Sequence, residues 1–300
     1  MHKPYSIQVE LVSGCTRQCE YCGLQAIWKT GDERKFMDIH TVDAISKSCG
    51  EFLDKARVEF AMFGEPTLHP ELCDALLLFR GNFPKCQTMV NTNGDLVAGK
   101  TFQADRIAQY FECGLNLLAI NVYDSDEKYA RLLAEAKAAA IPGVVVGEYT
   151  TGMNYYTYKS PTVKEIIFVQ SIALHNGARN TRRIWNHGGN VPAEIIEKYG
   201  GRTDNLPLPN MCVNPFREIA FRYDGTANIC CMDVKGEYPI GNIADSSVEE
   251  LWYSENMQLA RRALLGKDRN FAPCSGCNSP GGFRRALENK WFDEKSKGEK

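Results

Sequence analysis

Three cysteines within eight residues, Cys15, Cys19 and Cys22, constrain this chain more than any other feature of its sequence. Regular helix or strand geometry does not place all three side chains on one face, so the segment that carries them is predicted to be a loop. Residues 6–12 alternate polar and apolar side chains as a strand does, and Ser13-Gly14 then signals a turn. The thiols are therefore expected just beyond the carboxyl end of a strand, where α/β folds place their chemistry.

Strands and helices are predicted to alternate over the first 170 residues. This alternation indicates βαβ crossovers and a parallel sheet. About six βα units are present, and a closed eight-unit barrel usually needs about 250 residues. The predicted fold is therefore α/β, with a partial (β/α)6 TIM-like barrel. The predicted strands cover 6–12, 57–63, 87–91, 115–122, 144–149 and 165–170, and the predicted helices cover 41–55, 70–80, 102–112 and 126–140.

The C-terminal third has a different pattern. Residues 176–210 are rich in Gly, Pro, Asn and Arg, which predicts a junction between domains. Two short apolar runs then flank Tyr223-Asp224-Gly225, a typical hairpin turn, and a helix is predicted over 247–265. The predicted domains are the barrel (1–180), a linker (181–210), a small α+β domain of a β-hairpin plus a helix (211–289) and a charged tail (290–300).

The composition excludes several classes of protein. No apolar run approaches the length of a membrane span and no signal peptide is recognisable, so we expect a soluble, cytoplasmic protein without a membrane partner. A net charge of −2 gives no support to extensive nucleic-acid binding. Twelve cysteines in such a chain indicate metal ligation, redox chemistry or burial rather than disulfides. Four that lie singly, Cys49, Cys73, Cys86 and Cys113, are expected to be packing residues.

The CX3CX2C spacing of the first three cysteines would leave one iron of a four-iron cluster without a thiolate, open to a substrate or cofactor. With Tyr21 before the third cysteine, the motif resembles that of the radical S-adenosylmethionine (SAM) superfamily. The resemblance implies an enzyme whose [4Fe–4S] cluster, held by Cys15, Cys19 and Cys22, reductively cleaves SAM to a 5′-deoxyadenosyl radical that abstracts a substrate hydrogen atom. A structural zinc site is the alternative, but zinc usually takes four ligands.

The resemblance extends to other predicted strand ends. Gly64-Glu65-Pro66 resembles the family's Gly-Glu motif, in which the Glu65 carboxylate is the expected acceptor for the ammonium group of SAM. Asn91 and Asn93 stand at the polar end of the third strand. The resemblance gives Asn121 a ribose-binding place and puts Val169 against the adenine. The implied SAM-binding residues are Tyr21, Gly64, Glu65, Asn91, Asn93, Asn121 and Val169.

A second group of cysteines follows the predicted junction. Cys212, Gly225 and Cys230 form CX12GX4C, and Cys274 and Cys277 form CX2C. This pattern resembles the SPASM/Twitch subgroup, and its spacing is most like that of an aminocyclitol-oxidising dehydrogenase of that subgroup. No cysteine follows Cys277, so the resemblance implies one auxiliary [4Fe–4S] cluster with four thiolates, the Twitch version. Zinc is the alternative here too, because four cysteines suit either metal.

Four further residues are candidates for catalysis. Cys231 adjoins Cys230 and is either a packing residue, a ligand, or a donor of a hydrogen atom to a substrate radical, as cysteines are in radical SAM epimerases. Tyr149, His175 and Arg179 lie near predicted strand ends, where each could take or orient a proton.

A fully ligated auxiliary cluster suggests an electron acceptor. We therefore expect oxidation (dehydrogenation) of a hydroxyl- or amine-bearing small molecule, with a reductant such as flavodoxin or ferredoxin supplying electrons. Three alternatives stay open: a redox-neutral isomerase or epimerase, modification of a peptide, nucleotide or nucleic acid, and a non-enzymatic electron-transfer or scaffold protein with two clusters.

Overall fold

The computed structural model describes residues 3–148, 165–171 and 184–281. The candidates Tyr149, His175 and Arg179 lie outside the described residues, as does the predicted tail, residues 290–300.

The described strands form a nine-stranded sheet and a separate two-stranded one. In the large sheet the order is β11-β10-β9-β1-β4-β5-β6-β8-β7, and all pairings from β9 to β7 are parallel. The predicted parallel α/β architecture is confirmed. The strands are β1 (Ser6–Val9), β4 (Arg57–Phe60), β5 (Gln87–Thr92), β6 (Leu117–Val122), β7 (Val144–Glu148), β8 (Glu165–Ser171), β9 (Glu218–Phe221), β10 (Thr226–Asn228) and β11 (Pro239–Asn242); the small sheet pairs β2 (Val12–Ser13) with β3 (Lys35–Phe36).

Two features of the large sheet do not follow the order of the chain. Strand β8 lies between β6 and β7, and β9 pairs in parallel with β1. The predicted hairpin is present as β9 and β10, with Gly225 in its turn at φ +80°. A further strand, β11, continues it. The C-terminal hairpin therefore extends the barrel sheet, and no break in the sheet marks the predicted boundary at residue 211.

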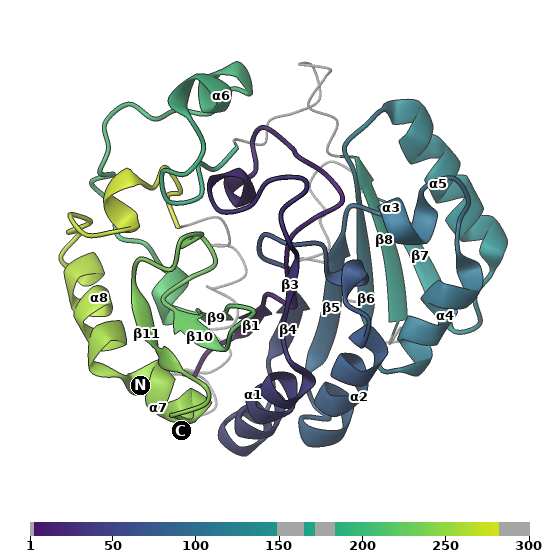
Figure 1. The fold of residues 1–300 in the computed structure, drawn as a ribbon, viewed down its shortest axis with the longest axis horizontal. Helices are drawn as coiled ribbons and strands as arrows, with labels where there is room; N and C mark the ends of the chain where they lie inside the picture. Colours follow the sequence, from purple (N-terminus) through teal and green to yellow (C-terminus); the bar gives the residue numbers. More distant parts are fainter. Residues whose placement is uncertain (1–2, 149–164, 172–183, 282–300) are drawn as a thin grey trace, which may run out of the picture.

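The helices that connect the parallel strands lie on the outer side of a curved sheet (Figure 1). Helix α1 begins after Asp38, whose side chain accepts the His40 N–H, and α5 begins after Ser125, which accepts the Lys128 N–H. These helices are α1 (Ile39–Phe52), α2 (Leu72–Asn82), α4 (Ala104–Glu112) and α5 (Asp126–Ala139), with a short α3 (Asp95–Ala98) after β5 and α6 (Ala193–Lys198) within the predicted linker.

The predicted helix over 247–265 is wrong as a single element. It is divided into α7 (Val248–Tyr253) and α8 (Glu255–Leu265). The Ser254 side chain accepts the N–H of Met257 and caps the second helix, because a serine hydroxyl satisfies a free helix N–H well. The N–H of Val248 donates to Ser48 Oγ of α1 at 2.7 Å, so the C-terminal helices pack on the barrel helices.

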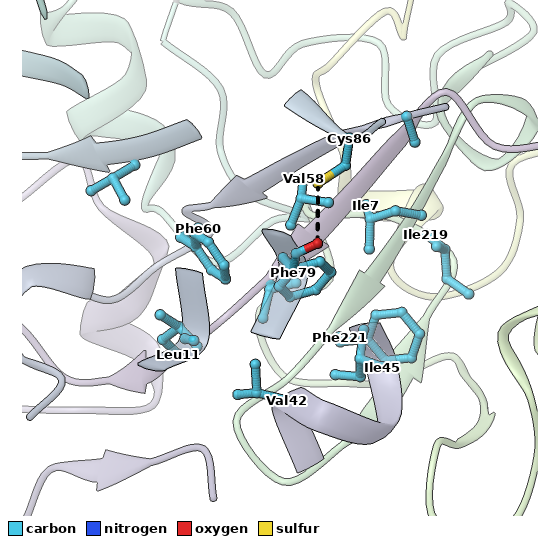
Figure 2. Packing of buried hydrophobic residues seen from close by; sticks show 14 of the residues in the cluster. Ile7, Leu11, Val42, Ile45, Val58, Phe60, Phe79, Cys86, Ile219 and Phe221 are labelled. Atoms are coloured by element: carbon cyan, nitrogen blue, oxygen red, sulfur yellow. Dashed lines mark hydrogen bonds between the residues drawn. The ribbon is translucent and has the colours of Figure 1, made fainter. Parts of the chain in front are cut away.

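The hydrophobic core fills the space between the sheet and these helices (Figure 2). Phe60 of β4 meets Phe79 of α2 edge to face, with ring centroids 5.6 Å apart. Burying each such side chain contributes about 1.5–3 kcal/mol. Cys49 and Cys86 are buried in this core, as predicted, and the Cys86 thiol donates to the Phe79 carbonyl at 3.9 Å. Cys73 and Cys113 are half-buried against it.

The opposite, inner face of the central strands is polar. Because side chains alternate along a strand, Ile7 and Val9 point to the core while Ser6 and Gln8 point inward. Gln8 donates to Ser6 Oγ and the Ser6 hydroxyl donates to Glu59, each at 3.0 Å. A buried face of this kind is expected to receive a polar ligand, since buried polar groups need hydrogen-bond partners.

No helix in the described part of the chain has both the length and the apolar composition needed to cross a membrane. The cytoplasmic location stays a prediction.

One buried carboxyl group makes the stability of this fold depend on pH. Glu10 follows β1 and is 1% exposed. Burial raises its pKa from 4.5 to about 7, although the charge of Arg222 and the Tyr223 N–H oppose the change. A raised pKa means that the folded state prefers the neutral carboxyl. The stabilising contribution is therefore complete below about pH 4.5 and is lost as the pH rises to about 7.

We predict that Glu10→Gln makes the free energy of unfolding depend less on pH. Glutamine stays neutral, so the variant should be more stable than the wild type at pH 7.5 by up to about 3 kcal/mol, and the difference should shrink towards pH 5.5. Anaerobic urea unfolding of the cluster-loaded protein between these values measures the effect. Glu51→Gln on the exposed face of α1 is the control. Equal pH profiles for the wild type and Glu10→Gln would contradict the prediction.

Candidate functional site

A cavity of about 460 Å³ lies at the carboxyl ends of the central strands, in the size range of ligand pockets. It brings together most of the residues that the sequence singled out. Those that line it are Cys15, Cys19, Tyr21, Cys22, Gly64, Glu65, Asn91, Asn93, Asn121 and Cys231.

The cysteine loop is tied to the ends of two strands. Arg17, between the first two cysteines, donates through Nε to Asp95 at 2.8 Å and through Nη1 to Asp124 at 2.9 Å. Asp95 follows β5 and Asp124 follows β6. Thr16 also donates to Asp95, at 2.8 Å. Charge-assisted hydrogen bonds of this kind are stronger than neutral ones, so they hold the loop over the sheet.

The three thiols of this loop are half-buried. Asn93 donates through Nδ2 to the Cys15 sulfur at 3.4 Å. Burial raises the pKa of all three thiols, that of Cys22 to about 12. Without metal they are therefore neutral, and metal binding must displace their protons.

Glu65 is 2% exposed and joins the ends of β4 and β5. Its Oε1 accepts hydrogen bonds from the Thr67 N–H at 3.1 Å and from the Thr92 hydroxyl at 2.7 Å, and its Oε2 accepts the Asn93 N–H at 2.8 Å. Burial raises the pKa of the carboxyl, while these hydrogen bonds lower it. Glu65 thus has a structural role at the cavity wall, and its contact with the ammonium group of SAM stays a prediction.

Position 64 has to be glycine because the backbone there passes very close to Val12. A Cβ atom there would lie 1.6 Å from the carbonyl oxygen of Val12, a distance that no side chain tolerates. Only glycine therefore lets the end of β4 pass so close to β2.

Three other predicted SAM-binding residues have distinct surroundings. Asn121 donates through Nδ2 to Asn91 Oδ1 at the cavity wall. The Tyr21 ring packs edge to face on Tyr199, with centroids 5.4 Å apart. Val169 is fully buried in the core and is not part of the described cavity wall, and its contact with the adenine stays a prediction. It pairs with Ile120, and both side chains point to the helices rather than inward.

The second group of thiols, Cys212, Cys230, Cys274 and Cys277, is buried. Burial raises their pKa values, to about 11 for Cys212 and about 12 for Cys274, and thiols of the group add to the effect on one another. Cys231, in contrast, lines the cavity from the turn that follows β10.

Both thiol groups have the donor chemistry of iron–sulfur clusters. In the ranges that the structure describes, no three Cys, His, Asp or Glu side chains converge on a single metal ion. A four-iron cluster does not require such convergence, because each thiolate binds its own iron. The first group offers three thiols beside a cavity and the second offers four away from it, which fits one cluster with an open iron and one closed cluster.

Sequence reasoning missed several residues of this site. Arg17 and its two aspartates could have been found as a cation inside the cysteine motif with acidic residues just after two strands. Glu218 of β9 is 3% exposed, lines the cavity and accepts the Cys231 N–H at 3.3 Å. His187 also lines the cavity, and only its place in a Gly-rich segment marked it.

We predict that Gly64→Ala disrupts the first thiol group. The added methyl group must push the end of β4 away from Val12, which costs about 1–3 kcal/mol or more. The variant should melt at a lower temperature and lose iron mainly from the first group, measured by anaerobic thermal unfolding and iron content. Gly81→Ala is the control, because a Cβ atom at this exposed position of α2 meets nothing within 4 Å. A Gly64→Ala variant as stable and as iron-rich as Gly81→Ala would contradict the prediction.

Comparisons with known proteins agree with this site. Residues 9–141 match the radical SAM superfamily, and residues 212–278 match the SPASM iron–sulfur cluster-binding domain. The SAM-dependent 2-deoxy-scyllo-inosamine dehydrogenase of Niallia circulans is 21% identical over 291 residues, which cover 93% of this chain and 95% of the relative.

Solved structures agree as well. The structure of BtrN in complex with AdoMet and 2-DOIA has a TM-score of 0.65 and 18% identity, over 93% of this chain and 94% of that chain. The structure of native anSMEcpe with bound AdoMet has a TM-score of 0.52 and 15% identity, over 87% of this chain and 84% of that chain. They confirm the fold.

The predicted family and the spacing similarity to an aminocyclitol-oxidising dehydrogenase are confirmed. The protein is an enzyme, and its cofactors are SAM, a [4Fe–4S] cluster and auxiliary iron–sulfur clusters. The chain carries a radical SAM domain over residues 9–141 and a SPASM iron–sulfur cluster-binding domain over residues 212–278.

Proposed function

We propose that the protein is a dehydrogenase that oxidises a hydroxyl- or amine-bearing carbon of a small molecule, with the auxiliary cluster as electron acceptor. The observation that carries this proposal is a cavity lined by the first thiol group and by residues that neighbour the second. Cys15, Cys19 and Cys22 line it directly. Asn214, Cys231 and Ser279, each one or two residues from a proposed auxiliary ligand, line it as well.

The proposed ligands are Cys15, Cys19 and Cys22 for the SAM-binding cluster and Cys212, Cys230, Cys274 and Cys277 for the auxiliary one. When bound, SAM and its cluster supply a 5′-deoxyadenosyl radical for hydrogen abstraction, and the auxiliary cluster supplies an acceptor for the second electron.

The chain itself contributes a polar wall for the substrate. Glu59 and Glu218 are buried, line the cavity and lie on the two strands that flank β1. Gln8 lies between them on β1, in register with Glu59. Carboxylates and an amide can accept hydrogen bonds from hydroxyl or ammonium groups, and a carboxylate can take the proton that a dehydrogenation releases. The relative's name, an inosamine dehydrogenase, supports a substrate of this kind.

A redox-neutral epimerase is the second candidate, because Cys231 faces the cavity. Its thiol is placed where it could return a hydrogen atom to a substrate radical. In both reactions an external one-electron reductant is needed, and we include flavodoxin or ferredoxin in the proposal.

The test is an anaerobic assay in D₂O of the cluster-loaded enzyme with SAM, a reductant and 2-deoxy-scyllo-inosamine. We predict 5′-deoxyadenosine and a two-electron-oxidised product in a ratio of about one to one, because each hydrogen abstraction by this radical consumes one SAM. Mass spectrometry of the product and chromatography of 5′-deoxyadenosine measure the ratio.

A different result would favour the epimerase. If the product is an isomer with one deuteron from the solvent, and Cys231→Ser but not the half-buried Cys73→Ser stops its formation, the dehydrogenase proposal is wrong. Absence of both 5′-deoxyadenosine and methionine from a fully loaded enzyme would contradict either reaction.

A further inference from the structure

Five residues of the predicted linker, Asn186 to Asn190, contact both cysteine loops of the site. We call residues 186–190 the bridging segment. In Figure 1 the N-terminal loop, in purple, and the C-terminal loop, in yellow, lie at the same end of the molecule. The hydrogen bonds of the bridging segment connect these two loops.

His187 makes the contact with the N-terminal loop. Its Nδ1 accepts the N–H of Gly23, the residue after Cys22, at 2.8 Å. A Cβ atom on Gly23 would lie 2.7 Å from the Cβ of His187, so the two backbones approach as closely as glycine permits. The His187 ring also packs edge to face on Phe63, with centroids 5.5 Å apart. One side chain thus contacts both the cysteine loop and the segment that precedes Gly64.

Asn186 makes the contact with the C-terminal loop. Its N–H donates to Asn278 Oδ1 at 2.7 Å, and the N–H of Asn278 donates to Asn186 Oδ1 at 3.0 Å. Asn186 also donates through Nδ2 to the carbonyl of Gly276 at 2.7 Å. These three hydrogen bonds involve Gly276 and Asn278, the residues on either side of Cys277 in the sequence.

Gly188, the residue after His187, also lies against the C-terminal loop. A Cβ atom there would lie 2.9 Å from the Cβ of Pro273, the residue before Cys274. A Cβ on Gly188 would lie 2.9 Å from the Met232 carbonyl oxygen, and one on Gly189 would lie 3.3 Å from that of Gly276. His187 and Gly188 therefore contact different cysteine loops although they are neighbours in the chain.

The conformation of the bridging segment is compact and unusual. His187, Gly188 and Gly189 all have positive φ angles, of 47°, 67° and 88°. Glycine adopts this region freely, but histidine does so at a cost that its surroundings must offset. The Asn190 N–H donates to the Asn186 carbonyl at 2.8 Å and closes the turn. Because a short, closed turn has little conformational freedom, its contacts on both sides fix the position of one cysteine loop relative to the other.

We propose that His187 is a positioning residue, which holds the two cysteine loops at a fixed separation and so sets the distance between the two iron–sulfur clusters. The inference rests on the two proposed cluster sites and on the hydrogen bonds of the bridging segment. It does not depend on whether the reaction is a dehydrogenation or an epimerisation.

The test compares His187→Ala with His187→Asn in the anaerobic, cluster-loaded enzyme. Asparagine keeps an acceptor at the δ position and tolerates positive φ, so it is the conservative variant. The first measurement is the magnetic interaction between the two reduced clusters by electron paramagnetic resonance, which depends on their separation. The second is hydrogen–deuterium exchange of residues 15–23 and 274–278.

We expect His187→Ala to change the magnetic interaction at unchanged iron and sulfide content. Exchange in both loops should become about three- to tenfold faster, the effect of losing one hydrogen bond. His187→Asn should restore both readouts towards the wild type. An unchanged interaction in His187→Ala, or faster exchange in only one loop, would overturn the proposal.

The wild-type enzyme provides a check that does not depend on the variants folding. The Gly23 amide should exchange slowly because it donates to His187 Nδ1, and an amide that exchanges as fast as an exposed one would also overturn the proposal.

Discussion

The guanidinium group of Arg17 is the anchor on which the geometry of the site depends. Residues 15–22 lie in neither a helix nor a strand and among themselves make one turn hydrogen bond, from the Cys22 N–H to the Cys19 carbonyl at 3.0 Å, so side chains provide the contacts that hold the loop on the sheet. The Arg17 side chain donates hydrogen bonds to the carboxylates of Asp95 and Asp124, which follow β5 and β6. Asn93 then contacts both the loop, at Thr16, and the Cys15 thiol. Glu65 accepts the Asn93 N–H and so joins the end of β4 to the same network. The ends of three strands therefore share one set of polar contacts with the cysteine loop.

This network is possible because the sheet separates two environments. Apolar side chains on the outer face, such as Phe60, are buried under helices, and the polar ones on the inner face surround the cavity. Buried carboxylates such as Glu59, Glu65 and Glu218 are costly without partners. Glu65 has four hydrogen bonds, which offset that cost within the protein. Glu218 faces the cavity, where a ligand can contribute further hydrogen bonds.

Local patterns predicted the elements well, because these depend on short-range spacing. The strands at residues 57, 87 and 144 begin where the alternation placed them, and the CX3CX2C loop lies at a cavity as expected. Strand order did not follow, since the pairing of β8 with β6 and of β9 with β1 is decided by tertiary packing. The break at Ser254 was missed because a mid-helix serine and a capping serine look alike without coordinates. The burial of Val169 on the helix side of β8 was not foreseen, because the face of a fully apolar strand cannot be read from its alternation. His187 was missed because its partner, Gly23, is 164 residues away.

The parallel pairing of β9 with β1 makes the auxiliary-cluster region a continuation of the barrel rather than an appended module. If β9 were removed, β1 would become an edge strand with a row of unpaired backbone groups next to the cysteine loop. Such an edge invites pairing with other chains. The two cluster regions are therefore expected to unfold as one cooperative unit, and a shorter version of this protein that ends at the barrel would be prone to aggregate. Loss of the second cluster region through evolution would require a different strand or helix to cover β1.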